Sequence, residues 1–219
     1  MISHFLRAVP KGILPTIVNT TYAQTTAAGA ATATLNVPTH KANDLLFVIV
    51  TVNAVGFVTT IPSGWVEVGK TTAAAERLGV YYKLASGSEP ASYNWVVAAQ
   101  SALLSFSVRY ATTYSIGAFA TGAGSTSSLN AVTTYTNGRI IACAGIDNFG
   151  QATSVATTSN SKFTFPSGNI INGNTLTSGL IGNVAIAINA QATDGLTSGT
   201  STVTMNSSQG LATVFLAVG

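Results

Sequence analysis

The sequence predicts an all-β protein, a single antiparallel two-sheet sandwich of the jelly-roll-like kind, preceded by an extended N-terminal arm. Three observations lead to this prediction. Apolar residues recur with a period of two, turn-forming residues separate these runs at short intervals, and no segment keeps a helical period. Many short strands at regular spacing are typical of sandwiches and barrels.

The clearest strand signals are the apolar runs. Residues 45–52 are almost continuously apolar, which suits a central strand covered on both faces. Residues 103–110 alternate large apolar with small polar side chains, which is typical of a half-buried strand. Residues 72–76 would form one helical turn at most. The other predicted strands are residues 16–21, 32–37, 65–70, 77–84, 93–97, 139–146, 182–189, 200–205 and 211–218.

Turn signals lie between these runs. Each supplies a proline with a fixed φ or a residue that tolerates a positive φ. They are Asn43-Asp44, the Pro-Ser-Gly triplets at 62–64 and 166–168, residues 86–90, Asn137-Gly138 and Asp194-Gly195.

The chain also contains an internal repeat. A shift of 94 positions places residues 35–37 and 43–47 on residues 129–131 and 137–141, and the apolar runs 101–106 and 210–215 resemble each other. Chance matching in a chain rich in Thr and Asn is the alternative. A few strands cannot bury a face alone, so we expect half-repeats of about 25–115 and 116–219 interleaved around one core. The predicted organisation is an arm over residues 1–24 and a sandwich over residues 25–219.

The composition favours a protein whose faces are covered by neighbours. Only 7% of residues are charged, against about 25% in typical proteins, and the 47% hydrophobic content argues against disorder. A surface so poor in charge is unusual for a free cytosolic monomer. The net charge is +3, but no two Lys or Arg residues are adjacent, so a nucleic-acid partner is not expected.

The N-terminal segment is expected to be an ordered arm. No run of about 18 apolar residues exists, so no membrane span is expected. Residues 1–23 carry Arg7, Lys11 and a modest apolar run, which faintly resembles a secretion signal. Pro10, Gly12 and Pro15 interrupt that run, so we expect no cleaved signal peptide.

Catalytic and metal-binding patterns are missing from the sequence. Zinc sites need three or four ligands at suitable spacing, and the chain has only His4, His40 and Cys143 beside six acidic residues. There is no Gly-x-Ser-x-Gly motif, and no lysine follows the glycine-rich stretches. We therefore expect no enzyme, no cofactor and no metal, and a buried, inert Cys143 thiol. A polysaccharide-degrading enzyme is the remaining catalytic alternative, and it would need two carboxylates facing each other across a groove.

The aromatic residues of the first half give a binding hypothesis. Exposed rings at Trp65, Tyr82, Tyr93 and Trp95 would form stacking platforms for a glycan. Core packing is the competing interpretation, because large aromatic side chains supply much of the burial in a sandwich.

Four motifs in order carry a family resemblance. They are Asn43-Asp44-Leu45-Leu46, Ile61-Pro62-Ser63-Gly64-Trp65, residues 77–85 and residues 89–95. In this order they resemble a β-sandwich module of tailed-phage structural proteins, and the likeness continues to the C-terminus. The resemblance implies a rigid, non-enzymatic particle protein. Related modules occur as head decorations, fibres and tail components, and residues 1–22 depart from the module.

The resulting hypothesis is a virion structural protein, assembled in the host cytoplasm, that serves as a head decoration or a head- or tail-attached fibre subunit. We expect it to form a homo-oligomer, for example a trimer, and to bind a capsid or tail protein. Apolar arm residues would make that contact, namely Phe5, Leu6, Ile13, Leu14 and Ile17. The alternative is a glycan-binding module that attaches to a polysaccharide on a host cell surface.

Overall fold

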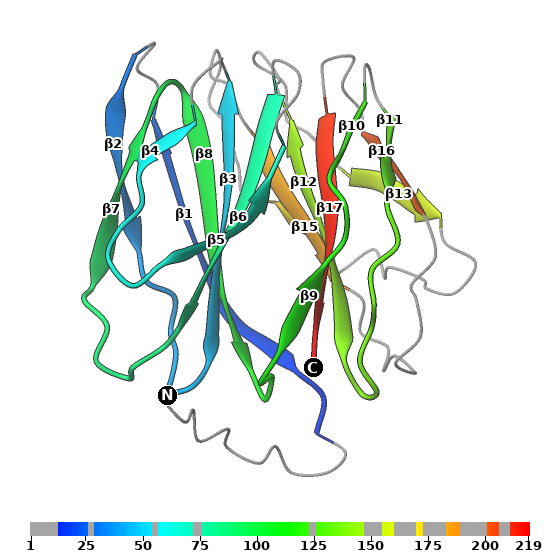
Figure 1. The fold of residues 1–219 in the computed structure, drawn as a ribbon, viewed down its shortest axis with the longest axis horizontal. Coiled ribbons are helices and arrows are strands. Elements are labelled where there is room, and N and C mark those ends of the chain that lie inside the picture. Colours follow the sequence, from blue (N-terminus) through cyan, green and yellow to red (C-terminus); the bar gives the residue numbers. More distant parts are fainter. Residues whose placement is uncertain are drawn as a thin grey trace.

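The computed structural model describes residues 13–25, 29–53, 57–71, 76–122, 126–146, 155–159, 170–172, 183–188, 201–205 and 211–219. Every regular element in these ranges is a β-strand, and they contain no helix long and apolar enough to cross a membrane. The strands pair antiparallel in four sheets, named A to D here (Figure 1). The prediction of an all-β antiparallel sandwich is confirmed.

The first half of the chain forms sheets A and B. Sheet A has the order β1-β8-β3-β6-β5, and sheet B has the order β2-β7-β4. The strands are β1 (Thr16–Thr25), β2 (Ala31–Asn36), β3 (Leu45–Asn53), β4 (Val58–Thr60), β5 (Val66–Lys70), β6 (Glu76–Leu84), β7 (Ser92–Val97) and β8 (Ser101–Arg109). Strand β1 pairs with β8, β2 with β7 and β3 with β6, so the strands form nested pairs. This is the connectivity of an eight-stranded jelly roll, except that β5 pairs with β6 in sheet A and not with β4 in sheet B.

The second half repeats this winding in sheets C and D. Sheet C has the order β10-β17-β12-β15-β14, with β9 also paired to β17, and sheet D has the order β11-β16-β13. The strands are β9 (Tyr114–Ile116), β10 (Ala120–Gly122), β11 (Thr126–Leu129), β12 (Arg139–Ile146), β13 (Val155–Ser159), β14 (Ile170–Asn172), β15 (Asn183–Ile188), β16 (Ser201–Met205) and β17 (Leu211–Val218). Adding nine to each strand label of sheets A and B gives the orders of sheets C and D. The chain is therefore a tandem of two jelly rolls.

The strand register refines the repeat seen in the sequence. Asn43 and Asn137, 94 positions apart, both have a positive φ just before the equivalent strands β3 and β12. Leu45 pairs with Val108 and Arg139 pairs with Val218, so β8 maps onto β17 by a shift of 110 positions. The sequence match of 101–106 with 210–215 is therefore one residue out of register.

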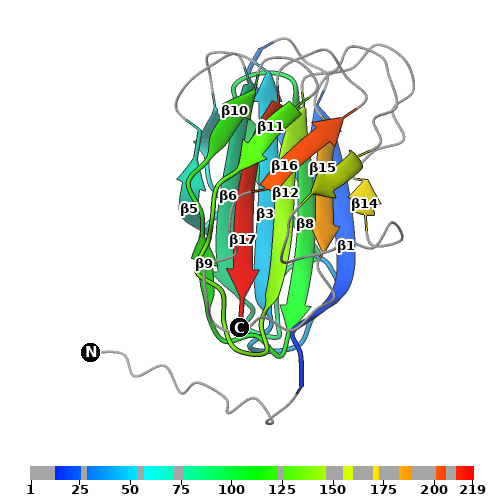
Figure 2. The ribbon, with the colours of Figure 1, turned by 90° about the vertical axis from the view of Figure 1, so that its right-hand side faces the viewer.

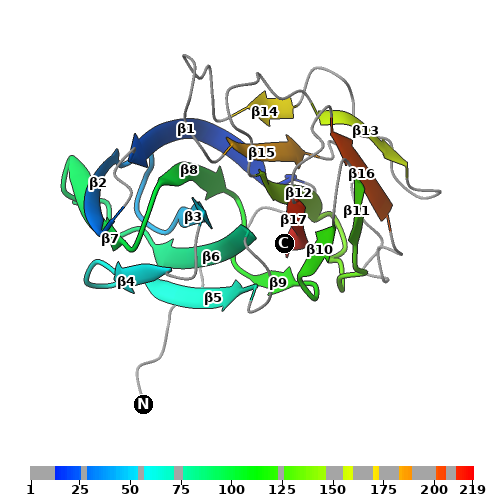
Figure 3. The ribbon, with the colours of Figure 1, turned by 90° about the horizontal axis from the view of Figure 1, so that it is seen from above.

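Sheets A and C pack face to face and share one apolar core. Seen from above, sheets B, A, C and D form four layers (Figure 3), and the strands of sheet D lie in front of sheet C in Figure 2. The expected common core is confirmed, but each sheet takes its strands from one half only. The two halves are therefore stacked, and their strands are not interleaved within a sheet.

An approximate two-fold axis parallel to the strands relates the two halves. Equivalent strands run in opposite order across sheets A and C in Figure 3, and β8 and β17 both end at the lower end of the molecule. The contacts between the two halves are reciprocal. Strand β12 contacts β6, and their equivalents β3 and β15 also contact each other. In the same way β17 contacts β6, and their equivalents β8 and β15 contact each other. The interface thus has the isologous form of a two-fold dimer.

Strand β3 divides its side chains between two cores. Leu45, Phe47 and Ile49 face the core between sheets A and C, whereas Leu46 and Val48 face the core between sheets A and B. The period of two in the sequence produces this division, since successive side chains point to opposite faces. The prediction of a central strand covered on both faces is confirmed.

Strand β8 differs from its expected half-buried state. Ser105 and Ser107 are almost completely buried, so both faces of the strand are covered. Their hydroxyls donate to the carbonyl oxygens of Phe47 (3.0 Å) and Thr39 (2.7 Å), respectively. Buried serines are tolerated here because the hydroxyls are hydrogen-bonded.

Part of the predicted arm belongs to the sandwich. Residues 16–25 form β1, which pairs with β8 along its whole length. Just before β1, Pro15 is buried and its carbonyl oxygen accepts a hydrogen bond from Arg139 Nε of the second half. The chain therefore enters the sandwich at a fixed point at the lower end. Residues 1–12 lie outside the described residues.

Candidate functional site

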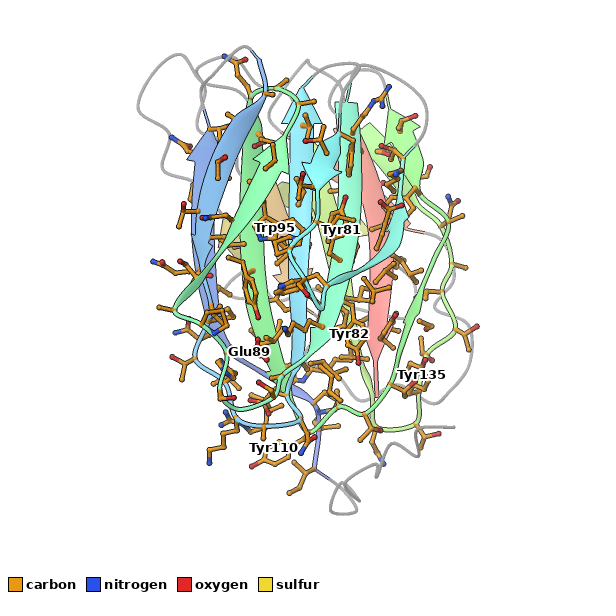
Figure 4. The ribbon with its side chains drawn as sticks, turned by 60° about the vertical axis from the view of Figure 1, so that its left-hand side comes forward. Tyr81, Tyr82, Glu89, Trp95, Tyr110 and Tyr135 are labelled. Carbon is orange, nitrogen blue, oxygen red and sulfur yellow. The ribbon has the colours of Figure 1, made fainter. Side chains whose placement is uncertain are left out.

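The two tryptophans proposed as glycan platforms lie in the core between sheets A and B. Trp95 is fully buried and Trp65 is 7% exposed. Their ring centroids are 5.3 Å apart, and Tyr81 packs against Trp95 at 5.1 Å (Figure 4). Strand β7 directs Trp95 inward, opposite Ala33 of β2, which leaves room for the large ring. Neither indole presents a ring face to solvent.

The two tyrosines of the same hypothesis are half-buried and border different cores, Tyr82 from β6 of sheet A and Tyr93 from β7 of sheet B. Tyr82 packs against Phe47 and Tyr114 at the edge of the core between sheets A and C, with ring centroids 5.7 Å and 4.7 Å away. Tyr93 packs edge-on against Trp65 at the border of the other core. The four rings therefore do not form one row, and glycan stacking by Tyr82 or Tyr93 remains a prediction.

A polar network lies beside Tyr93 near the lower end of this core. Lys83 Nζ is 3.1 Å from Glu89 Oε2 and donates to the Tyr93 hydroxyl at 2.8 Å, and that hydroxyl donates to Glu89. The backbone N–H and the hydroxyl of Ser86 donate to Glu89 Oε1, each at 2.8 Å. The Glu89 side chain is only 2% exposed, so both of its oxygens are taken up inside the protein.

The chemistry of Glu89 is that of a permanent anion. Burial alone would raise the pKa of its carboxyl, but the hydrogen bonds from Tyr93, Ser86 and Lys83 outweigh burial and lower the pKa to about 2. A general acid or base works best with a pKa near the operating pH. Glu89 is therefore suited to hold the loop between β6 and β7, and not to exchange protons.

A second ion pair lies at the same end, between the start of β3 and the end of β8. Arg109 Nη2 donates to Asp44 Oδ2 at 2.9 Å, and Arg109 Nε is 3.2 Å from the same oxygen. The Lys41 backbone N–H also donates to Asp44 Oδ2 at 2.8 Å. The hydrogen bond to Asp44 raises the pKa of Arg109. Asp44 is 4% exposed, so the pair sits under the surface with the guanidinium outward.

Tyr110 follows Arg109 and was not among the candidates drawn from the sequence. It is the one aromatic residue among the exposed large hydrophobic residues of the described chain, at 40% exposure, and Figure 4 places it at the lower end. Its φ is +64°. The sequence gives little sign that Tyr110 is exposed. Tyr110 ends a regular apolar strand pattern, and a positive φ is rare for a bulky residue.

The predicted arm contacts are only partly described. Ile13 is exposed, Leu14 is half-buried, and Ile17 packs against the shared core from β1. Phe5 and Leu6 lie outside the described residues. Ile17 therefore contributes to the fold itself, and Ile13 marks the point at which the chain reaches the surface.

The remaining chemical groups form no reactive constellation in the described chain. No three His, Cys, Asp or Glu residues there gather to hold a metal ion. Cys143 lies in the core between sheets A and C, where burial raises the pKa of its thiol, so the expected buried cysteine is confirmed. His40 Nδ1 lies 2.8 Å from the Pro38 carbonyl oxygen and stabilises its own loop. The side chains of the described part of the chain are therefore suited to binding through ring contacts and hydrogen bonds.

Comparisons with family models, with curated proteins and with solved structures find no match for this chain.

Proposed function

We propose that the chain is a non-enzymatic structural protein of a virion, a head decoration or a head- or tail-attached fibre subunit held by its N-terminal arm. The observation that carries the proposal is the tandem of jelly rolls joined through one apolar core. Such a body is expected to be stiff, because β3 is buried on both faces and the two halves share one apolar core. Jelly rolls are a common building block of viral capsids.

The low charge supports the same proposal. In the described chain the two most buried carboxylates, Asp44 and Glu89, are paired with Arg109 and Lys83 and lie under the surface. The outer strand β2 presents uncharged side chains, with Thr32, Thr34 and Asn36 exposed. Surfaces of this kind pack against other subunits without charge repulsion. We propose a homo-oligomer, such as a trimer, bound to a capsid or tail protein in the particle.

The arm is proposed to attach the subunit to the particle. Arg139 donates to the Pro15 carbonyl oxygen, which fixes the first described residues of the chain to the second half. Deleting residues 1–22 would remove most of β1 and leave one edge of β8 without its partner, so it would not test attachment alone. Deleting residues 1–12 removes Phe5 and Leu6 and leaves β1 complete.

The experiment replaces the gene in the source phage with the version lacking residues 1–12 and measures the chain in purified particles by mass spectrometry. We expect the full chain in the particles and loss of the shortened chain, with the shortened chain still folded in the lysate. Phe5→Ser with Leu6→Ser should have the same effect, whereas Val66→Ala, on the exposed β5 edge, should be incorporated normally. Absence of the full chain from purified particles would overturn the proposal.

The second candidate function is glycan binding. Jelly rolls also occur as lectins, and among the described residues Tyr110 is an exposed aromatic ring next to the Arg109–Asp44 pair. A host surface polysaccharide is then the partner, and both functions are compatible in one particle protein.

A further inference from the structure

Five residues at the lower end of the first jelly roll form a surface corner. Asp44 and Arg109 face each other across the end of the β3–β8 ladder, one position beyond the Leu45–Val108 pair. Asn43 and Lys41, both exposed, precede Asp44, and the exposed Tyr110 follows Arg109. We call these residues, Lys41, Asn43, Asp44, Arg109 and Tyr110, the Tyr110 corner.

The second jelly roll provides an internal comparison. The repeat places Gly138 at the position of Asp44 and Gly219 at the position of Arg109. Gly138 there packs against Tyr135 and the Val218 carbonyl oxygen, with no ion pair at these two positions. The same corner of the fold is thus formed without a charged pair. The Asp44–Arg109 pair is therefore not required by the jelly-roll connectivity, which points to a role at the surface.

The conformation of Tyr110 points the same way. A bulky residue at φ +64° is strained, because the Cβ atom crowds the backbone in the left-handed region. A glycine would avoid this strain, and strained positions of this kind cluster at ligand sites. This conformation holds an exposed aromatic ring at the residue that follows Arg109, whose guanidinium is bound to Asp44.

The corner offers a complete set of groups for a sugar. Arg109 uses Nε and Nη2 on Asp44, and no described residue accepts from its Nη1. The exposed amide of Asn43 and ammonium of Lys41 add donors and an acceptor within the same short loop. An exposed aromatic face can stack on a sugar ring, and hydrogen-bonding groups on nearby residues can bind the sugar's hydroxyls.

We propose that the Tyr110 corner binds a saccharide, with the Tyr110 ring stacked on a pyranose and Arg109 and Asn43 bonded to its hydroxyls. This site differs from the four rings that the sequence singled out, of which Trp65 and Trp95 are buried. The site rests on the glycan-binding alternative proposed above, and sugar binding by the isolated chain tests it separately from the proposed place in a virion.

The test is saturation-transfer NMR on the purified full chain with five probes: glucose, galactose, rhamnose, N-acetylglucosamine and glucuronate. We expect at least one probe to receive magnetisation and to lose affinity by about tenfold or more in Tyr110→Ala. Arg109→Lys keeps the charge but loses the planar fork, so it should also weaken binding. Val66→Ala is the matched control, because Val66 is an exposed apolar residue on β5, three strands from β8.

Tyr110→Gly separates binding from folding, because glycine accepts the positive φ. We expect this variant to melt no lower than Tyr110→Ala and to bind no probe. The proposal is overturned if no probe binds the full chain, or if binding survives in Tyr110→Ala. If the Tyr110→Ala variant is lost from particles and the full chain binds no sugar, the saccharide proposal is also overturned. The corner would then be assigned to a protein contact.

Discussion

At the scale of single residues, Glu89 shows how a buried charge is held in this chain. Its carboxylate accepts from Ser86, Tyr93 and Lys83, and its pKa is lowered to about 2. The unfolded value is 4.5, so the folded state favours the ionised form. The stabilisation is therefore fully present above about pH 4.5 and is lost as the pH falls toward 2.

The corresponding variant is Glu89→Gln. We expect it to lower the free energy of unfolding by about 3 kcal/mol near pH 7, because it leaves Lys83 buried without its anion. The stability difference from the wild type should shrink between pH 4.5 and pH 2. Urea titrations at several pH values measure both effects. Glu67→Gln, which breaks the exposed pair with Lys70, is the control and should change stability by less than about 1 kcal/mol.

Tyr110 supports a second prediction at this scale. At φ +64° an alanine keeps the backbone strain and a glycine relieves it, so Tyr110→Gly should be more stable than Tyr110→Ala by about 1 kcal/mol. At an ordinary strand position the alanine variant would be the more stable of the two. Denaturant midpoints of the two variants decide the question, and a more stable alanine variant would contradict the assigned conformation.

At the scale of the elements, the contact between β3 and β12 is tight where the two halves meet. Thr51 and Gly145 occupy equivalent positions of the repeat and touch across the core. A Cβ atom on Gly145 would overlap Thr51 Oγ1 and come within 3.1 Å of Leu78 Cδ1. The glycine is therefore what allows the equivalent strands to approach.

Gly145→Ala should lower the free energy of unfolding by about 1–3 kcal/mol through overpacking. Adding Thr51→Ala should recover part of that loss, so a double-mutant cycle with chemical denaturation should give a coupling energy. Gly29→Ala is the control, because no atom lies within 4 Å of the added carbon. Additive effects of Thr51→Ala and Gly145→Ala would contradict the contact.

The long strands were predictable from the sequence and the short ones were not. The runs at 139–146 and 211–218 match β12 and β17, because eight residues with apolar character on both faces leave little choice of structure. Strands such as β4 (Val58–Thr60) and β9 (Tyr114–Ile116) were missed, since three residues show no periodicity. Pairing with a neighbour defines these strands, and that neighbour is distant in the sequence.

The candidate site was harder to predict, for physical reasons. Trp95 and Tyr82 belong to similar β-forming runs, yet one is fully buried and the other is half-buried at the edge between two sheets. The stacking of sheet B on one face of sheet A and of sheet C on the other determines this difference. Tyr110 was missed because its exposure depends on a backbone angle that its sequence neighbours do not signal.

At the scale of the whole molecule, the shared core makes the two jelly rolls one cooperative unit. Phe47 and Phe106 of sheet A and Ile141 and Leu216 of sheet C lie in the same cluster. We expect one thermal transition, with equal calorimetric and van't Hoff enthalpies. Two resolved transitions would show that the halves unfold separately and that the interface contributes little.

The central claim is that this body is a fixed component of a particle, and counting its copies in purified virions tests it most directly. Quantitative mass spectrometry before and after a high-salt wash gives the number of chains per particle. We predict a constant copy number that the wash leaves unchanged, because apolar contacts do not depend on salt as charge contacts do. A variable number, or loss of the chain in the wash, would contradict it.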